Sequence, residues 1–312
     1  MALAEAVLYE QISQEQLETC LIWHNGSIQF EYEQADTLLQ QVRPINSCTK
    51  SVVSLLCCIG MDNGLFPAPD ELAEHYFPKL KALVPQHFRR PTIEHLLTLS
   101  VGFKWQEFGG IQSFPTMKRS PNWLEFLFSQ PIVREPGTRM CYNSGISQML
   151  TTLLTETSGM TVAAFAEHYL FHHLNISQYN WLKDKQGIYT GGFGLFLTPQ
   201  DMLKVGLLCL AEGSYNNKQL VSSTLLAQAT SPLLPARLPA YAGYYGWHWW
   251  IDDIQYQSKN VSFYYARGYG GQFIFIVPKL SLVVSTTKNQ KLKGQLPLEW
   301  FKAKLLPSYV DV

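Results

Sequence analysis

The spacing of apolar residues changes twice along this 312-residue chain, and this change restricts the folds that the chain can adopt. Residues 21–23 and 28–32 predict a β-hairpin, because the Asn25-Gly26 pair between them supplies the positive φ angles of a two-residue turn. Residues 47–59 are apolar nearly all round, which predicts a buried helix. Further helices are expected in the middle of the chain, at residues 92–97, 122–128, 146–157, 162–174 and 199–210, the last with Thr198 as its N-cap. From about residue 243 the period returns to two, which predicts strands at residues 245–251, 261–266, 272–277 and 282–286 before a closing helix at residues 297–306.

The two groups of strands are expected to pair into one antiparallel sheet, with the helical segment inserted between them. The predicted fold class is therefore α+β, an antiparallel β-sheet flanked by helices plus an inserted all-helical domain. Residues 1–65 and 235–312 would form the sheet domain, which is discontinuous in sequence, and residues 66–234 the mainly helical domain. An active site is expected at the interface between the two.

Composition narrows the class of protein. The formal net charge is zero, and 46% of the residues are hydrophobic. Long disorder is excluded by this apolar content, and the lack of a basic excess argues against a nucleic-acid-binding protein. The six cysteines form no Cys-x-x-Cys pair and lie mostly in apolar runs, so buried reduced thiols are expected. No signal peptide is visible and the longest apolar run, residues 52–61, is too short to cross a bilayer. We therefore expect a cytoplasmic protein without a membrane span, while the oligomeric state stays open.

A candidate nucleophile and base stand at the start of the long apolar helix. Ser47 and Lys50 are three residues apart, which places them on one face of a helix. A serine hydroxyl needs a neighbour that removes its proton, and burial would lower the pKa of the lysine enough for it to act as that base. The free N–H groups of a helix N-terminus would also favour a developing anion.

Taken alone, this tetrad is weak evidence. Ser47 as a simple N-cap and Lys50 as a surface cation is the favoured interpretation of the four residues by themselves. Ser285 and Lys288 repeat the same spacing, but they end an expected strand and precede polar residues, so Lys288 is expected to be solvated.

A second feature lies in residues 136–145, just before an expected helix. Tyr142 and Ser144 are two residues apart in an extended segment, so both side chains point to one side. A phenol beside a lysine can relay protons. The alternative is that Ser144 is an N-cap and Tyr142 a buried core residue.

A third feature is the glycine-rich segment of residues 266–272, where a strand is expected to begin. Glycines allow close backbone approach, and a bare strand edge can offer an N–H group to an oxyanion. A β-bulge or a tight turn would explain the same glycines.

The order and context of these motifs resemble the serine β-lactamase and penicillin-binding-protein superfamily, in its class C and esterase-like branch. The resemblance runs from about Leu21 to Asn289 and is carried by the combination of segments, residues 45–51, 92–98, 136–145, 191–202 and 268–278. It implies a β-lactamase/transpeptidase-like fold.

The resemblance also implies an acyl-serine mechanism on a small-molecule acyl substrate, with no metal or organic cofactor. Ser47 would attack a carbonyl, and Lys50 and Tyr142 would share the general acid–base work. The backbone N–H groups of Ser47 and Tyr269 would form the oxyanion hole, and water would release the acyl group. The remaining oxyanion or substrate-binding residues would be Asn143, Ser144, Arg267, Gly268 and Gly270.

The chain departs from the family pattern at two positions. Ser144 stands where the family usually has the Asn of Tyr-x-Asn, and Ala266-Arg267-Gly268 stands where it has Lys-Thr-Gly or His-x-Gly. The cation that meets a β-lactam or peptide carboxylate is therefore missing, unless Arg267 points inward. Penicillin recognition is put in doubt, and an esterase or amidase acting on a small substrate is favoured over a β-lactamase.

Two other hypotheses remain from the sequence. The altered third motif would also suit a catalytically idle member of the fold that binds a cell-wall peptide or glycan. His168, His172 and His173 have a spacing that can hold zinc, although no His-Glu-x-x-His motif is present, and a surface helix end is the simpler interpretation. Trp105 and Phe193 could border the site in the family arrangement.

Overall fold

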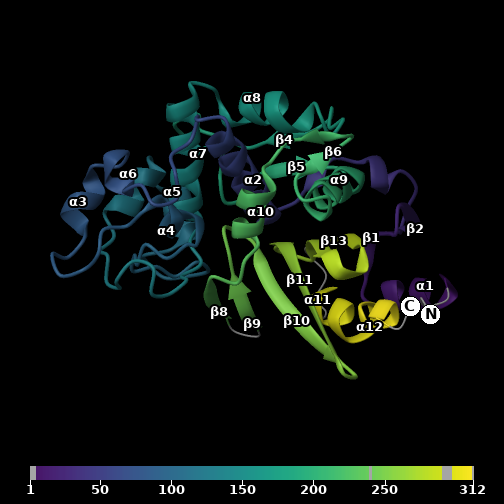
Figure 1. The fold of residues 1–312 in the computed structure, drawn as a ribbon. Coiled ribbons are helices and arrows are strands. Elements are labelled where there is room, and N and C mark those ends of the chain that lie inside the picture. The colour runs from purple at the N-terminus through teal and green to yellow at the C-terminus, as the bar shows by residue number, and fades with distance from the viewer. Residues whose placement is uncertain (1–4, 239–240, 290–296, 311–312) are drawn as a thin grey trace.

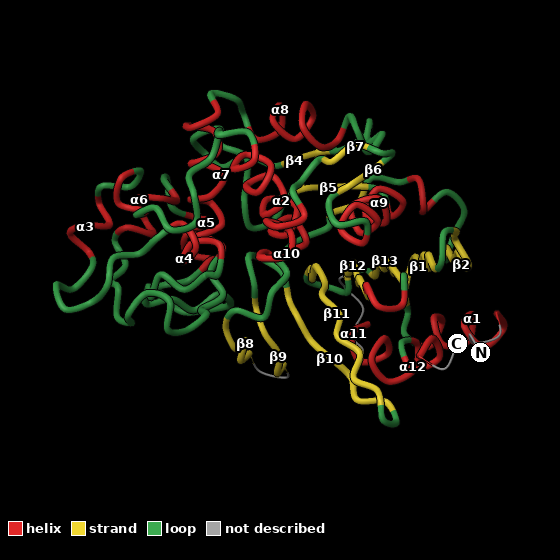
Figure 2. The backbone as a smooth tube through the Cα atoms, in the orientation of Figure 1, coloured by secondary structure: helices red, strands yellow, loops and turns green. Residues whose placement is uncertain are grey.

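The computed structural model describes residues 5–238, 241–289 and 297–310. Its main feature is an antiparallel sheet with the strand order β2-β1-β13-β12-β11-β10-β9-β8 (Figures 1 and 2). The early hairpin and the late strands pair through β1 and β13, as predicted. The strands are β1 (Leu17–His24), β2 (Ser27–Glu33), β8 (Leu234–Leu238), β9 (Tyr241–Tyr245), β10 (Trp250–Tyr256), β11 (Lys259–Gly268), β12 (Gln272–Val277) and β13 (Leu282–Lys288). The predicted α+β class, with an antiparallel sheet and flanking helices, is confirmed.

Helices cover both faces of this sheet, so every residue of β12 and β13 is buried. One face packs against α2 (Cys48–Asp62) and α9 (Pro199–Leu210) (Figure 1). The other face is covered by α1 (Glu5–Gln14) and by the C-terminal segment. That segment consists of α11 (Pro297–Trp300), a π-helical turn (Phe301–Leu305) and α12 (Pro307–Val310). Stacking of the Phe275 and Phe301 rings, with centroids 4.0 Å apart, holds this second layer on the sheet.

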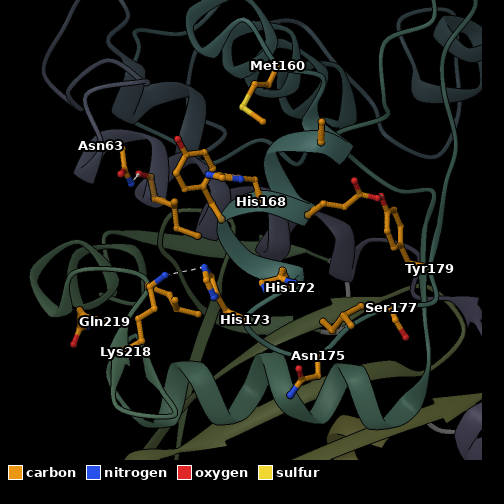
Figure 3. Close-up of a pocket in the computed structure, with 16 residues that line it drawn as sticks. Asn63, Met160, His168, His172, His173, Asn175, Ser177, Tyr179, Lys218 and Gln219 are labelled. Carbon is orange, nitrogen blue, oxygen red and sulfur yellow. Dashed lines mark hydrogen bonds between the residues drawn. The ribbon is translucent and has the colours of Figure 1, made fainter.

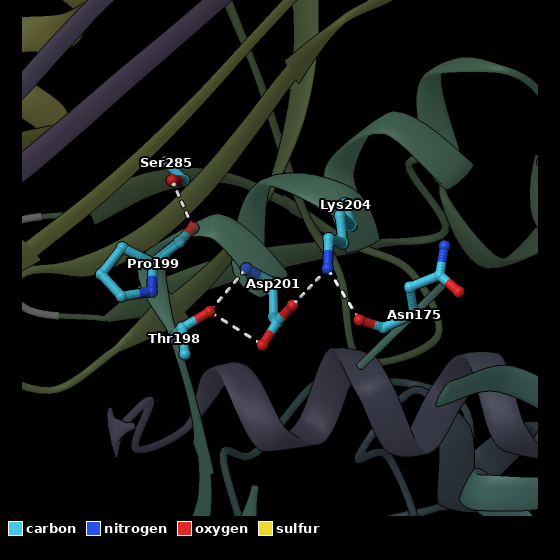
Figure 4. Close-up of polar contacts among 6 residues, drawn as sticks. All are labelled: Asn175, Thr198, Pro199, Asp201, Lys204 and Ser285. Atoms are coloured by element: carbon cyan, nitrogen blue, oxygen red, sulfur yellow. Dashed lines mark hydrogen bonds and ion pairs between the residues drawn. The ribbon is translucent and has the colours of Figure 1, made fainter. Parts of the chain in front are cut away.

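Helix α9 begins where its capping residues predict (Figure 4). The Thr198 hydroxyl accepts from the backbone N–H of Asp201 at 3.0 Å, and Pro199 occupies the first turn. Ser285 of β13 donates to the Pro199 carbonyl at 3.2 Å, which fixes the start of α9 on the sheet. The Lys204 amine donates to the Asp201 carboxylate at 2.7 Å and to the Asn175 carbonyl at 2.9 Å. Helix α9 packs on β12 and β13. The division into domains at residues 65–66 and 234–235 stays a prediction.

The middle of the chain is mainly helical but not all-helical. Its longest helix, α7 (Ser144–Ser158), packs beside α2, and the shorter helices are α3 (Lys79–Leu83), α4 (Ile93–Leu97), α5 (Phe114–Arg119), α6 (Trp123–Phe128), α8 (Val162–Ala166) and α10 (Ser223–Ala229). It also contains short strands: β4 (Asn180–Trp181) and β5 (Leu195–Leu197) form one sheet with β3 (Arg43–Pro44) from earlier in the chain, and β6 (Ser214–Tyr215) and β7 (Lys218–Gln219) form another.

None of the helices in the described parts of the chain combines the length and the apolar character that crossing a membrane requires.

The prediction of one continuous strand over residues 245–251 is wrong. Strand β9 ends at Tyr245 and β10 begins at Trp250, and His248 between them has a φ of +60°. The backbone N–H of Trp247 donates to the Ala229 carbonyl at 2.8 Å, and that of His248 to the Leu97 carbonyl at 3.0 Å. The aromatic residues in this segment suggested a continuous strand. They are instead buried against the helical part of the chain, because tertiary contacts there outweigh their β-propensity.

His248 is a buried polar residue that links the sheet to the helices through hydrogen bonds. Its Nδ1–H donates to the Leu97 carbonyl at 2.6 Å, and its Nε2 accepts from the Ser147 hydroxyl at 2.9 Å. Burial lowers the pKa of His248 to about 3, from an ordinary value of 6.5. The unfolded chain therefore binds a proton that the folded chain does not, so the stability that the neutral ring contributes is present above pH 6.5 and is lost as the pH falls toward 3.

We expect this group to lower the free energy of unfolding by about 2 kcal/mol between pH 7 and pH 5. Urea unfolding at the two pH values checks the prediction. His248→Gln should show a smaller pH dependence, because the amide does not titrate, whereas replacement of the exposed His87 by Gln should leave the dependence as it is. Equal pH dependence in all three proteins would contradict this role of His248.

Candidate active site

Ser47 occupies the N-cap position of α2, but its side chain makes no capping hydrogen bond. Its hydroxyl instead lies 3.4 Å from the Nζ of Lys50, one turn further into the helix. Residues Cys48 to Gly60 of α2 are all buried, and Lys50 is only 1% exposed. The interpretation of Lys50 as a surface cation is therefore wrong.

Polar partners surround the Lys50 amine. Its Nζ donates to the Ser144 hydroxyl at 2.9 Å and to the Gly192 carbonyl at 2.7 Å. A side chain at Gly192 would collide with Ser144, because a Cβ there would lie 2.8 Å from the Ser144 hydroxyl oxygen. Burial lowers the pKa of Lys50 to about 8, and the negative charge of Glu107 opposes that shift. A substantial fraction of the amine is therefore neutral near pH 8.

Glu107 is a site residue that the sequence analysis missed. One of its carboxylate oxygens accepts from the Ser144 hydroxyl. The other accepts from the Ser144 backbone N–H at 3.0 Å and from the Trp105 indole N–H at 2.8 Å. The result is a continuous buried network from Lys50 through Ser144 to Glu107. Glu107 lies 37 residues from Ser144 in a loop, and no local pattern marks it.

Tyr142 lies between the Lys50 amine and an aromatic wall. The amine is 4.6 Å from the centre of the Tyr142 ring, which stacks on Trp250 at 5.7 Å. Burial raises the pKa of Tyr142 well above its ordinary value, and a hydrogen bond with the Ser47 side chain opposes that effect only in part. Tyr142 is thus a protonated phenol at neutral pH, beside the Ser47 hydroxyl.

The end of β11 is joined to the segment before α2. Gly268 allows this, because a Cβ at that position would lie 2.3 Å from the Ile45 carbonyl oxygen. The Asn46 side-chain amide donates to the Tyr269 carbonyl at 2.7 Å. Within the described parts of the chain, the backbone N–H groups of Ser47 and Tyr269 have no acceptor. Both groups therefore have the capacity to donate to a substrate oxygen.

Part of this site borders a pocket of about 470 Å³. Ser47, Tyr142 and Tyr269 line it, with Trp105 and Trp250 as aromatic walls. Arg267 also lines it, with its guanidinium carbon 5.6 Å from the centre of the Trp250 ring, so its side chain does point inward. Phe193, in contrast, packs on Phe114 and Trp123 and does not line the pocket.

Four residues of the predicted oxyanion or substrate-binding set do not line this pocket, namely Asn143, Ser144, Gly268 and Gly270. Asn143, rather than Ser144, is the N-cap of α7, because its Oδ1 accepts from the backbone N–H groups of Gly145 at 2.8 Å and Ile146 at 3.2 Å. Asn143 is 1% exposed and does not line the pocket, so its assignment to substrate binding stays a prediction. Gly270 serves the turn between β11 and β12 with a φ of +85° and does not line the pocket either.

The three histidines line a separate, larger pocket of about 1240 Å³ (Figure 3). His173 pairs with the Lys218 amine at 2.9 Å, which puts a cation where a metal ion would have to bind. Over the parts of the chain that the structure describes, no cluster of three His, Cys, Asp or Glu side chains could hold a metal ion. The geometry gives the zinc hypothesis no support.

The second Ser-x-x-Lys tetrad lies outside the pocket. Ser285 is on β13 and donates to the Pro199 carbonyl. Lys288 is 5% exposed, so the expectation that it is solvated is wrong, because Gly271 packs against its side chain. Along a strand, positions i and i+3 point to opposite faces, so this serine and lysine do not meet.

The free thiols agree with the sequence analysis. All six cysteines are unpaired, and only Cys141 is partly exposed.

Comparisons with known proteins place this geometry in a family. The Beta-lactamase family model matches residues 22–305 of the chain. An uncharacterized protein of Alkalihalophilus pseudofirmus is 22% identical over 270 residues, which cover 78% of this chain and 73% of that protein.

The fold is similar to that of a candidate 6-aminohexanoate-dimer hydrolase from Bacillus anthracis, with a TM-score of 0.77, 18% identity and coverage of 97% of this chain and 80% of that one. It is also similar to EstCE1, a hydrolase with promiscuous acyltransferase activity, with a TM-score of 0.72, 14% identity and coverage of 94% and 95%. Since the family model spans most of the chain, the chain belongs to the Beta-lactamase family.

Proposed function

We propose that this protein hydrolyses small carboxylic esters through an acyl-enzyme formed on Ser47. The observation that supports this most directly is the position of the Ser47 hydroxyl. It lies 3.4 Å from a buried lysine amine whose pKa is lowered to about 8, and it borders the pocket. A hydroxyl with an adjacent neutral amine is the arrangement that activates a serine nucleophile.

The two protonation states assign the acid–base roles. Neutral Lys50 takes the Ser47 proton as Oγ attacks the ester carbonyl carbon, and the N–H groups of Ser47 and Tyr269 donate to the resulting oxyanion. Tyr142, which keeps its proton at neutral pH, donates to the departing alkoxide and is reprotonated from Lys50. Water then attacks the acyl-serine by the reverse sequence, which yields the acid and restores the Ser47 hydroxyl.

An active enzyme is favoured over an idle binding module. Nucleophile, base, acid and two free N–H donors all border or adjoin the same pocket, and Arg267 supplies a cation where the third motif lacks Lys or His. EstCE1, a hydrolase with promiscuous acyltransferase activity, has a similar fold, which supports acyl-transfer chemistry, whereas the Bacillus anthracis protein carries the name of a 6-aminohexanoate-dimer hydrolase. Amides and β-lactams are therefore included as arms of the test.

Intact-mass spectrometry tests the proposal. The protein is exposed to a fluorophosphonate and to a panel of activated esters, anilides and β-lactams, and the modified peptide is then sequenced. We expect one equivalent of fluorophosphonate and a transient acyl adduct from the esters, both on Ser47. A protein that stays unmodified by every reagent while it binds a peptidoglycan peptide would replace the proposal with the idle-module hypothesis.

The pH dependence gives a separate prediction. Activity should rise with pH as the Lys50 amine loses its proton, with a midpoint near the pKa of about 8. Glu107→Gln removes the negative charge that holds this pKa up, so the midpoint should move to lower pH, by about one unit. The measurement is kcat/KM for p-nitrophenyl butyrate between pH 5 and 10, with Glu125→Gln as a control on an exposed carboxylate. A midpoint that stays in place or moves upward in Glu107→Gln would contradict this coupling.

A further inference from the structure

The pocket beside Ser47 carries an excess of positive charge. Its ionisable lining residues other than the tyrosine and cysteine side chains are Glu107, Arg134, Arg139 and Arg267. Glu107 is held inward by Ser144 and Trp105, so its carboxylate is already occupied. The arginines therefore dominate the charge that an incoming substrate meets.

The two arginines of the loop before α7 have no protein partner. Arg134 and Arg139 are both exposed and both line the pocket. Among the described residues, neither side chain has a hydrogen-bond or ion-pair partner. Glu135, the carboxylate next to Arg134 in sequence, is taken by Arg89 at 3.0 Å. By contrast, Arg43 pairs with Glu18, and Arg90 with Glu74. Ion pairs within the protein therefore do not explain why Arg134 and Arg139 lie together at this pocket.

Arg134 and Arg139 come from the loop before α7, whereas Arg267 comes from β11. Both of their charges act on Cys141, where they oppose the rise in thiol pKa caused by burial. The guanidinium of Arg267 lies instead over the Trp250 ring. The pocket therefore offers two arginines, Arg134 and Arg139, in addition to Arg267 at the position of the family's third motif.

We propose that the substrate is an ester that carries a carboxylate remote from its scissile bond, bound at Arg134 and Arg139. This rests on the proposed ester hydrolysis at Ser47 and names the substrate class for that site. A guanidinium fork matches the two oxygens of a carboxylate, and two such groups fix both its position and its orientation. The aromatic walls Trp105 and Trp250 suit the apolar chain between the carboxylate and the ester.

Matched pairs of substrates test this. Mono-4-nitrophenyl adipate is compared with methyl 4-nitrophenyl adipate, where the charge is on the acyl side. The compound 4-acetoxybenzoate is compared with its methyl ester, where the charge is on the leaving group. We expect kcat/KM to favour the anionic member of at least one pair by about tenfold, and added KCl to reduce that preference. A wild-type protein that favours the neutral member of both pairs would overturn the proposal.

Variants assign the preference to the two arginines. In the Arg134→Gln/Arg139→Gln double variant, the anionic-to-neutral ratio of kcat/KM should fall by about tenfold. Arg119→Gln is the control, because Arg119 is exposed on α5 outside the pocket and should leave the ratio unchanged. A double variant that keeps the wild-type ratio would show that these arginines do not bind the carboxylate.

A binding measurement separates this proposal from ester hydrolysis itself. Isothermal titration of the Ser47→Ala protein with monomethyl adipate and dimethyl adipate does not depend on turnover. Tighter binding of the monoanion, lost in the double arginine variant, supports the subsite even if no ester is hydrolysed. Equal binding of the two compounds refutes it even if neutral esters are hydrolysed.

Discussion

Replacement of Ser47 by alanine is expected to lower kcat/KM for p-nitrophenyl butyrate by about 10⁴-fold or more. The hydroxyl is the only group that the mechanism allows to form the covalent intermediate, and its Oγ makes no helix-capping bond whose loss would unfold the protein. Activity and fluorophosphonate labelling should disappear together, while the melting temperature stays close to that of the wild type.

Ser285→Ala is the matched control, because Ser285 begins the other Ser-x-x-Lys tetrad. Its hydroxyl donates to the Pro199 carbonyl, far from the pocket lining, so this variant should lose about 1 kcal/mol of stability and keep its kcat/KM. Ester hydrolysis that persists undiminished in Ser47→Ala would falsify the acyl-serine proposal.

Lys50→Arg is expected to lower kcat/KM by about 10³-fold. The guanidinium keeps the positive charge opposite Glu107, so the buried network is not left with an unpaired carboxylate. It does not lose its proton at any accessible pH, however, and so it cannot act as the base. Lys50→Met should be as inactive, and its pH profile should lack the rise near pH 8.

Measurements of the pre-steady-state burst and of the pH profile separate this role from a structural one. Lys288→Met serves as the control, since Lys288 is also buried, at 5% exposure against 1% for Lys50, but lies outside the pocket. It should keep the pH midpoint of the wild type even if its stability falls. A Lys50→Arg protein with wild-type activity would show that the charge of Lys50, and not its proton exchange, matters.

The parts of the fold that the sequence predicts well are those that local contacts specify. The Asn25-Gly26 turn has the expected positive φ angles, and Thr198 caps α9 as its side chain allows. The all-round apolar pattern of residues 47–59 indicated a buried helix, which α2 is. The continuous strand expected at residues 245–251 is interrupted, because the backbone N–H groups of Trp247 and His248 bond to carbonyls distant in sequence.

The sequence by itself determined that a serine and a lysine share one face of a buried helix, since the period of a helix is a local property. Whether that lysine meets a phenol, a second hydroxyl and a carboxylate depended on the tertiary structure, because Tyr142, Ser144 and Glu107 reach it from loops and helices elsewhere in the chain. The position of Arg134 and Arg139 also depended on the tertiary structure, because only folding brings these two cations to the pocket without a partner from the described protein. Charges and hydrogen bonds between distant segments leave no period in a sequence, and only the packed chain brings them within reach of one another.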